Sequence, residues 1–227
     1  MLIKDDRDSL ENLKLFVEDW AGPVLPEYGL KEEEVPAYFP KPLRDLYLFA
    51  GNWPVNSRSS RKKSPANGQP AIFQIQDILM SVENTIRSQG RISFITENQG
   101  NWTCEVEEGN DESPVYCNAA ALWDDTVKGH ERVCNSLQHF LVTFCLQELM
   151  FSSRFVGAIQ ADLKQELFRE QLEPIWLDGY YVFKEPTHSF YLCANKLLIM
   201  DYAGLWYASN DESALSLINN RGLVHSL

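Results

Sequence analysis

Apolar residues recur at helical spacing in several parts of the chain and predict its main helices. The first helix begins at Ser9, whose hydroxyl is a suitable N-cap, and ends at a Gly-Pro pair. Pro42 suits the first turn of a short helix over 43–50, and another helix is predicted over 76–88. The longest helix is predicted over 136–151, with an apolar face broad enough to pack firmly against a sheet.

Runs with strand character lie between and after these helices. Before the longest helix, turn residues separate three runs that predict an antiparallel meander: RISFIT, NWTCEVE and SPVYCNA. A short strand is also predicted over 71–75. After the longest helix comes a second β-rich part, about residues 174–208, with five such runs: PIWLD, YYVFK, SFYLCA, KLLIMDY and LWYAS.

Helices and antiparallel strands therefore occur in blocks, which predicts an α+β fold: a mostly antiparallel β-sheet flanked by helices. A capping-box pattern of Ser209 and Glu212 predicts a last helix over 210–220. No linker-like stretch divides residues 151 to 175, so we expect one domain over 1–227. The pattern leaves open whether the second β-rich part continues the main sheet or packs separately.

The two strands of the hairpin over 101–118 have a register that their apolar residues select. A four-residue loop sets three apolar pairs opposite each other: Val106 and Val115, Cys104 and Cys117, Trp102 and Ala119. A shift of one residue would set Cys104 against Tyr116 instead. We therefore expect Cys104 and Cys117 to be neighbours in the core, with Glu105 and Glu107 on the outer face.

Composition limits the environment of the protein. Hydrophobic residues make up 44% of the 227, enough for a substantial core. No apolar run approaches the roughly 18 residues needed to span a membrane, and the N-terminus lacks the pattern of a signal peptide. Five cysteines with no CxxC pair are typical of reduced, buried thiols. We expect a cytoplasmic protein that does not bind membranes, in which the triplet Asn101-Trp102-Thr103 is not glycosylated.

The formal net charge is −12, which disfavours nucleic acid and favours a basic partner. The alternative is that the acidic residues serve solubility alone. One basic run, Arg58 to Lys63, lies in a stretch over 56–70 without apolar periodicity. We interpret that stretch as an exposed loop rather than a nucleic-acid contact, because it has no interleaved aromatic residues.

Motifs for catalysis or cofactors do not occur in the chain, which contains no G-x-S-x-G, GxGxxG or GxxxxGK[ST]. His130 and Cys134 have a spacing that metal ligands use, but a new helix is predicted between Cys134 and His139, and no fourth ligand is placed. We expect no enzymatic activity, no metal and no cofactor. A hydrolase or metal enzyme with an unrecognised site is the alternative from another class.

Trp53 and Trp123 stand in turn-like contexts, GNWPV and LWDD, and are expected to be exposed. A tryptophan beside carboxylates suits protein recognition, because the indole gives affinity and the charges steer a basic partner. The predicted partner contacts are Trp53, Glu105, Glu107, Glu108, Asp111, Glu112, Trp123, Asp124 and Asp125.

The order of these pieces resembles the Smi1/Knr4 (SUKH) superfamily. The resemblance covers roughly residues 10 to 220 and is carried by four segments: FPKPLRDLYLFAGNW, ISFITENQGNWTCEVEEGNDESPVY, SLQHFLVTFCLQE and LLIMDYAGLWYASNDESALSLI. It implies an α+β fold without enzymatic activity. The loop over 56–70 and the second β-rich part are longer than a minimal member needs.

Many bacterial members of that superfamily are thought to be immunity proteins that neutralise toxin domains, often nucleases, whereas fungal relatives act as interaction hubs. The resemblance therefore implies a toxin-neutralising immunity protein, with a regulatory hub without a toxin partner as the alternative. A nuclease toxin is basic because it holds phosphate, which agrees with the acidic charge of this chain. The sequence leaves the oligomeric state open.

Overall fold

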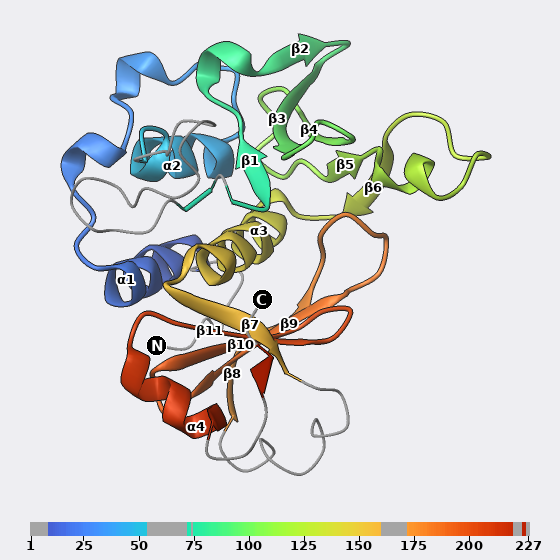
Figure 1. Cartoon of the computed structure of the whole chain (residues 1–227). Helices are drawn as coiled ribbons and strands as arrows, with labels where there is room; N and C mark the ends of the chain where they lie inside the picture. The colour runs from blue at the N-terminus through green and yellow to red at the C-terminus, as the bar shows by residue number, and fades with distance from the viewer. Residues whose placement is uncertain (1–8, 54–71, 74, 160–171, 220–223, 226–227) are drawn as a thin grey trace.

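The computed structural model describes residues 9–53, 72–73, 75–159, 172–219 and 224–225. Two antiparallel sheets lie on opposite sides of the helix α3 (Leu137–Ser152), as Figure 1 shows. The predicted α+β class is thus confirmed. The sequence left open whether the second β-rich part continues the main sheet. In the structure this part forms a sheet of its own. The predicted basic loop over 56–70 falls outside the described residues.

The first sheet has the strand order β1-β3-β4-β5-β6, and β2 also pairs with β3. Its strands are β1 (Asp77–Leu79), β2 (Ile86–Ser88), β3 (Arg91–Glu97), β4 (Thr103–Glu107), β5 (Val115–Cys117) and β6 (Glu131–Cys134). The predicted meander is β3, β4 and β5. The β4–β5 register sets Cys104 opposite Cys117 and Val106 opposite Val115, as predicted.

The third predicted pair of that hairpin, Trp102 with Ala119, is not part of the β4–β5 ladder. The side-chain oxygen of Asn118 accepts a hydrogen bond from the Thr103 amide (2.8 Å) and ends the ladder there. All five cysteines of the chain are buried. Burial raises the pKa of the Cys104 thiol well above its usual value, so this side chain stays protonated in the core.

The helix predicted over 76–88 is wrong. This segment forms β1, a 3₁₀ turn η3 (Val82–Asn84) and β2. The carboxyl group of Glu148 on α3 accepts hydrogen bonds from the backbone amides of residues 75, 76 and 77 (2.8, 3.2 and 2.9 Å), which holds the chain extended. Of the expected apolar stripe, Ile86 is 56% exposed. The strand predicted over 71–75 is also wrong where it is described, because Ile72 and Phe73 form a turn.

The second sheet has the order β12-β7-β11-β10-β9-β8. Its strands are β7 (Phe155–Ile159), β8 (Leu172–Gly179), β9 (His188–Cys193), β10 (Leu197–Asp201), β11 (Leu205–Ser209) and β12 (Val224–His225). The run YYVFK was predicted as a strand but lies in the β8–β9 loop, where Tyr181 and Val182 turn into the core. A hydrogen bond from the Tyr181 hydroxyl to Asp77 (2.6 Å) holds this loop against the first sheet.

Helix α3 is buried on every side over residues 140–150, which explains its broad apolar face. The Ser136 hydroxyl caps it by accepting a hydrogen bond from the His139 amide (3.2 Å). Two further helices pack against it, α1 (Ser9–Ala21) and α2 (Lys41–Ala50). The 3₁₀ turn η1 (Pro26–Tyr28) follows α1, and the 3₁₀ turn η2 (Glu32–Glu34) precedes α2. One hydrophobic cluster runs from the first sheet through α3 to the second.

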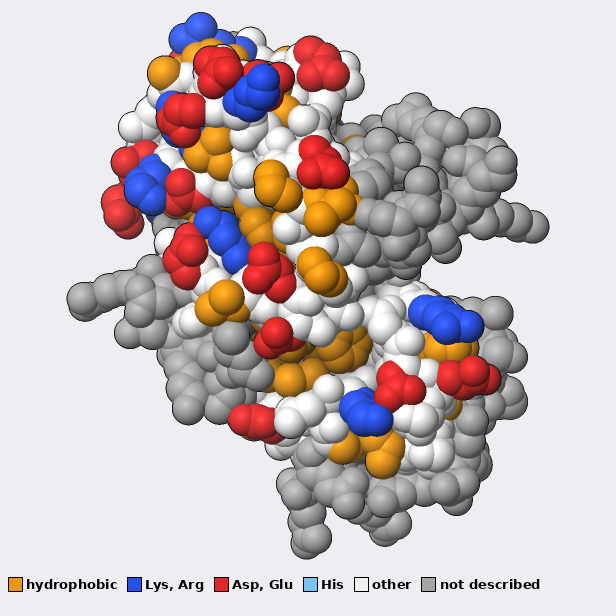
Figure 2. Space-filling view, turned by 90° about the vertical axis from the view of Figure 1, so that its left-hand side faces the viewer, with side chains coloured by type: hydrophobic (Ala, Val, Ile, Leu, Met, Phe, Trp, Pro, Cys, Tyr) orange, Lys and Arg blue, Asp and Glu red, His pale blue; other side chains and the backbone are white. Residues whose placement is uncertain are grey.

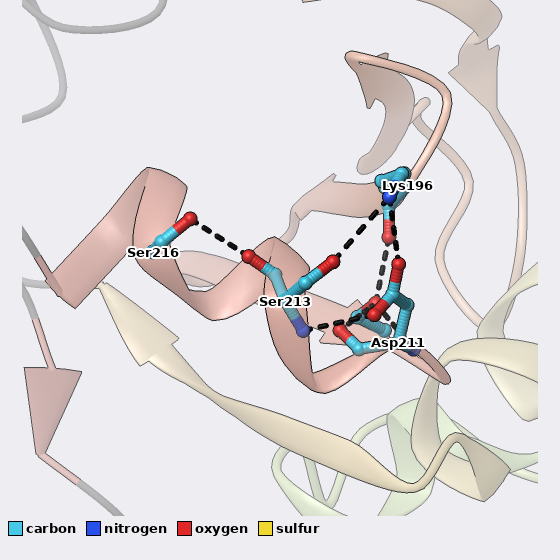
Figure 3. A network of polar contacts seen from close by, with 5 residues as sticks. Lys196, Asp211, Ser213 and Ser216 are labelled. Atoms are coloured by element: carbon cyan, nitrogen blue, oxygen red, sulfur yellow. Dashed lines mark hydrogen bonds and ion pairs between the residues drawn. The ribbon is translucent and has the colours of Figure 1, made fainter.

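The last predicted helix is split into the 3₁₀ turn η6 (Glu212–Leu215) and the short helix α4 (Ser216–Asn219). Its cap is Asp211, which accepts a hydrogen bond from the Ser213 amide (2.8 Å), so the predicted Ser209–Glu212 capping box is wrong. Figure 3 shows Asp211 between Ser213 and Lys196. The hydrogen bond from the Lys196 ammonium (2.8 Å) is the main reason why the pKa of Asp211 falls to about 2.

Candidate functional site

The predicted acidic face of the hairpin is largely neutralised by its own neighbours. Glu105 lies between Arg91 (3.7 Å) and His130 (3.5 Å), with its side chain mostly covered. Glu108 forms a two-point ion pair with Arg87, at 2.7 Å from Nε and 2.6 Å from an Nη atom. Hydrogen bonding to Arg87 lowers the pKa of Glu108.

Glu107 is similarly engaged. It accepts hydrogen bonds from the side chains of Asn110 (2.8 Å) and Tyr116 (2.8 Å), and these two bonds lower its pKa. The Arg91 guanidinium lies over the Tyr116 ring at 3.6 Å from its centroid. The outer face of the hairpin is thus a mixed network of acids, bases and an aromatic ring. The outward position predicted for Glu105 and Glu107 is confirmed, whereas their role as partner contacts stays a prediction.

At the tip of the hairpin loop, Asp111 accepts a hydrogen bond from the Lys41 amide (2.6 Å), while Glu112 is exposed. The face of the molecule that lies on the left in Figure 1 also mixes its charges. Figure 2 shows acidic and basic side chains alternating over that face, with apolar side chains in a hollow between its upper and lower parts. The charge of −12 therefore does not form a single-sign field on this side.

The expectation that Trp53 is exposed is wrong, because its side chain is only 3% exposed. Its ring packs against Tyr28 (centroids 5.0 Å apart) and Phe73 (5.8 Å). The turn after α2 directs it inward, since the Asn52 amide donates to the Tyr28 carbonyl (2.8 Å) and ties the two segments together. Trp53 therefore belongs to the core and not to a contact surface.

The β5–β6 connection carries the exposed predicted residues. It contains the 3₁₀ turn η4 (Ala119–Leu122) and projects from the sheet in Figure 1. Trp123 is 66% exposed, as its turn context predicts, and Leu122 beside it is 48% exposed. Asp124 and Asp125 follow, and both are exposed. We call residues 122–125 the tryptophan turn.

Local hydrogen bonds give the tryptophan turn a defined shape. An oxygen of Asp124 accepts from the amide (2.9 Å) and the hydroxyl (2.6 Å) of Thr126, the hydroxyl being the main reason for its lowered pKa. The Trp123 ring leans on Phe183 of the β8–β9 loop, with centroids 5.7 Å apart. Of the nine predicted contacts, three are thus grouped at one exposed place: Trp123, Asp124 and Asp125.

A cavity of about 280 Å³ lies behind Trp123, between the two sheets and α3. Its lining comes from β1 and the residue before it, from β3, α3 and β11, from the turn after η4, and from the loops beside β4, β8 and β10: Gln76, Asp77, Glu97, Trp102, Trp123, Gln147, Phe151, Tyr181, Val182, Tyr202, Ala203 and Trp206. Exposed Gln76, Trp123 and Ala203 mark its opening, and buried Asp77 and Gln147 mark its floor. We call it the aromatic cavity. Of the nine predicted contacts, all within the described ranges, Trp123 alone lines it.

The floor of the aromatic cavity is a polar network centred on Asp77. One oxygen of this carboxylate, Oδ2, accepts hydrogen bonds from the Tyr181 hydroxyl (2.6 Å) and the Gln147 amide (2.9 Å). The Gln147 carbonyl oxygen lies 3.0 Å from His188 Nε2, which must therefore carry a proton, so that Nδ1 accepts from Thr187 (2.9 Å). Burial lowers the pKa of His188 to about 3 and keeps it neutral.

Two buried carboxyl groups lie close to this floor. Burial raises the pKa of Asp77 to about 6, against the hydrogen bonds from Tyr181 and Gln147 that lower it. Burial and then the charge of Asp77 raise the pKa of Glu148 to about 8, against its three backbone donors. At pH 7 Asp77 is therefore mostly ionised and Glu148 mostly protonated. Asp77 can accept a hydrogen bond from a ligand in the cavity or exchange a proton near neutral pH.

The potential metal ligands weighed from the sequence point to different partners. His130 Nε2 lies 2.9 Å from the Thr103 hydroxyl, and the Cys134 thiol donates to the Ser136 carbonyl (3.2 Å). His139 Nε2 lies 3.0 Å from the Asp178 carbonyl. Within the described ranges no three His, Cys, Asp or Glu side chains are grouped so that they could hold a metal ion.

Sequence reasoning missed the residues of the aromatic cavity. One signal was present: Gln147 and Glu148 are two polar residues in the middle of the most apolar helix, where a buried polar group needs a partner. Comparisons of the chain with protein-family models, curated proteins and solved structures found no match. In the part of the chain that the structure describes, each helix is too short or too polar to cross a membrane.

Proposed function

We propose that this chain is a non-enzymatic, cytoplasmic protein-binding module that holds a basic protein partner through the tryptophan turn. The observation that supports this proposal is the grouping of an indole 66% exposed with two exposed carboxylates on a projecting turn. Exposed aromatic anchors beside acidic groups are typical of contact surfaces for basic proteins.

The energetics favour a contact at this place. Burying the exposed part of an indole removes on the order of 100–150 Å² of apolar surface from water, which contributes about 2–4 kcal/mol to binding. Asp124 and Asp125 add long-range attraction for a basic partner. The hairpin carboxylates contribute less, since Arg87 and Arg91 already offset their charge. The contact roles of Asp111 and Glu112 remain predictions.

The partner that we propose is a toxin domain, so that the chain acts as an immunity protein. Two observations support this choice: the order of sequence motifs that resembles the Smi1/Knr4 superfamily, and the net charge of −12, which suits a basic nuclease. A regulatory hub would use the same turn for a partner that is not a toxin. The two functions differ in whether co-expression of the chain protects a cell from a toxin.

The test is co-expression with the toxin domain that a neighbouring gene encodes. Wild-type chain should restore growth, and Trp123→Ala should weaken binding by roughly 30-fold or more, following from the 2–4 kcal/mol above. Asp124→Lys with Asp125→Lys should slow association and reduce its salt dependence. Glu18→Lys with Asp19→Lys on α1 makes the same charge change on exposed residues elsewhere and is the matched control.

Three outcomes would contradict the proposal. Full protection by Trp123→Ala would remove the tryptophan turn from the contact. Equal losses in the α1 control would show that net charge alone acts. A neighbourhood without a toxin gene, together with a stable complex with another protein, would replace the immunity function by that of a hub.

A further inference from the structure

The aromatic cavity has walls of a kind that attract positive charge. Trp102, Trp123, Tyr181, Tyr202 and Trp206 line it from both sheets and from the turns between them. The faces of such rings carry negative quadrupole potential, which binds ammonium and guanidinium groups. The lining residues in the described part of the chain carry two carboxylates, Asp77 and Glu97, and no basic group.

Asp77 has one acceptor atom left for a ligand. Its side chain is 3% exposed and lines the cavity. Both hydrogen bonds that it receives, from Tyr181 and Gln147, end on Oδ2. Oδ1 receives none from the described residues. This second oxygen can therefore accept a hydrogen bond from a donating or positively charged group in the cavity.

The walls are held in place before any ligand arrives. The Tyr202 ring stacks on His188 with centroids 4.0 Å apart and an interplanar angle of 13°. Trp102 meets Tyr181 edge-on at 6.1 Å, and Trp206 donates from Nε1 to the Tyr202 carbonyl (3.2 Å). A site arranged in this way loses little conformational entropy on binding. Trp123 differs, since it is mostly exposed and stands at the opening.

Other ligand classes fit less well. An anion would be repelled by Asp77 and Glu97 in a site of low dielectric constant. A neutral apolar group would fill the cavity but leave Oδ1 of Asp77 without a partner and without water. An organic cation satisfies the carboxylate and the rings together.

We propose that the aromatic cavity binds an organic cation, an alkylammonium or guanidinium group, with Asp77 as its counter-ion and the tryptophan and tyrosine rings as its walls. The source of the cation rests on the proposed function: it is a lysine or arginine side chain of the protein partner that covers the tryptophan turn. Trp123 belongs to both places, because it is exposed on the turn and lines the cavity.

The first test uses free cations and the intrinsic fluorescence of the tryptophans. Choline, Nα-acetyl-lysine amide and Nα-acetyl-arginine amide are titrated into the full chain, with 3,3-dimethylbutan-1-ol as the neutral analogue of choline. We expect the cations to bind at least tenfold more tightly than the alcohol. Binding should tighten as the pH rises through about 6, where Asp77 ionises.

Variants assign the binding to the cavity. Asp77→Asn keeps an oxygen for the Tyr181 hydroxyl and should weaken cation binding at least tenfold without affecting the alcohol. Tyr202→Leu removes a wall and should weaken both, which keeps the test decisive if Asp77→Asn folds poorly. Glu33→Gln, on the exposed turn η2, is the control and should change nothing. Equal binding of choline and the alcohol, or unchanged choline binding in Asp77→Asn and Tyr202→Leu, would overturn the cation site.

The second test separates this inference from the proposed function. Asp77→Asn should weaken the complex with the toxin domain at least tenfold, and choline should compete with that domain. If cations bind but the complex is unaffected, the cavity takes a free small cation and the partner side chain is excluded. If cations bind and no protein partner exists, the proposed function fails while the cation site remains. If the toxin domain binds and free cations do not, the cation site fails while the proposed function remains.

Discussion

The hairpin over 105–112 and the aromatic cavity both contain carboxylates, but these have opposite surroundings in the two regions. On the hairpin, Arg87 and Arg91 pair with Glu108 and Glu105 at the surface. In the cavity, Asp77 has only uncharged donors around it. The ion pairs on the hairpin leave little negative charge for a partner to bind. The buried carboxylate of Asp77 has no basic partner among its hydrogen-bond donors, so its charge is available to a ligand. The number of acidic residues in a stretch of sequence therefore says little about where a cation binds.

Substitution of Glu148 should cause the largest loss of stability, because its carboxyl group accepts hydrogen bonds from three backbone amides in the interior. Glu148→Leu leaves these donors without an acceptor and should lower the free energy of unfolding by about 3–5 kcal/mol. Glu148→Gln retains one carbonyl oxygen and should lose less. Urea denaturation measures both variants. A loss below about 1 kcal/mol for Glu148→Leu would mean that these three hydrogen bonds do not hold β1 in place.

Substitution of Tyr181 should cause the second-largest loss of stability, since its hydroxyl donates a hydrogen bond to the buried carboxylate of Asp77. Tyr181→Phe removes that charge-assisted bond and should cost about 1.5–3 kcal/mol. The pKa of Asp77 should rise further, because one of the bonds that lowers it is gone. Choline binding in Tyr181→Phe should then require a higher pH than in the wild type. An unchanged pH profile would contradict the assignment of Asp77 as the counter-ion.

The pH dependence of stability should differ between the two regions. The pKa of Glu148 is about 8 in the folded chain and 4.5 as the reference value, so the folded state binds more protons between these values. Stability contributed by this group is complete below pH 4.5 and decreases as the pH rises toward 8. Asp77 acts in the same direction between about 4 and 6. His188, whose pKa falls from 6.5 to about 3, acts in the opposite direction below 6.5.

Above pH 6.5 only the Glu148 contribution remains among these three groups. We expect the free energy of unfolding to fall by about 1–2 kcal/mol between pH 6.5 and 8.5. Glu148→Gln should remove this slope, whereas Glu112→Gln on the hairpin loop should preserve it. Denaturation curves at four pH values in that range would measure the slope, and a flat wild-type profile would contradict the raised pKa.

Features determined by neighbouring residues were predicted well from the sequence. Helix α3 begins at the Ser136 cap, and the β4–β5 register follows from alternating apolar residues. Both depend on periodicities of a few residues. The exposure of Trp123 also followed from its local turn.

Features determined by distant residues were missed. The segment after residue 75 has helical periodicity but is held extended by Glu148, about 70 positions later in the chain. Trp53 stands in a turn but is covered by Tyr28 and Phe73. The aromatic cavity draws its lining from strands, a helix and loops that only the fold brings together. The polar pair Gln147 and Glu148 in α3 indicates a buried polar contact, but no pattern within one segment shows which distant residues complete the cavity.

The smallest effect is expected at Glu105 on the hairpin. Glu105→Gln removes its ion pair with Arg91 (3.7 Å) and changes its contact with His130 (3.5 Å), whose pKa is lowered by burial; both contacts are long and near the surface. The free energy of unfolding should fall by roughly 0–1 kcal/mol in low salt, and the difference should vanish near 1 M NaCl, where screening acts over about 3 Å. Partner binding should change little, because the charge of Glu105 is already offset within the chain. A loss comparable to that of Glu148→Leu, or one that persists in high salt, would mean that the hairpin carboxylates are as essential as the buried ones. The contrast between the two regions would then fail, and the hairpin would return as the first candidate for the contact.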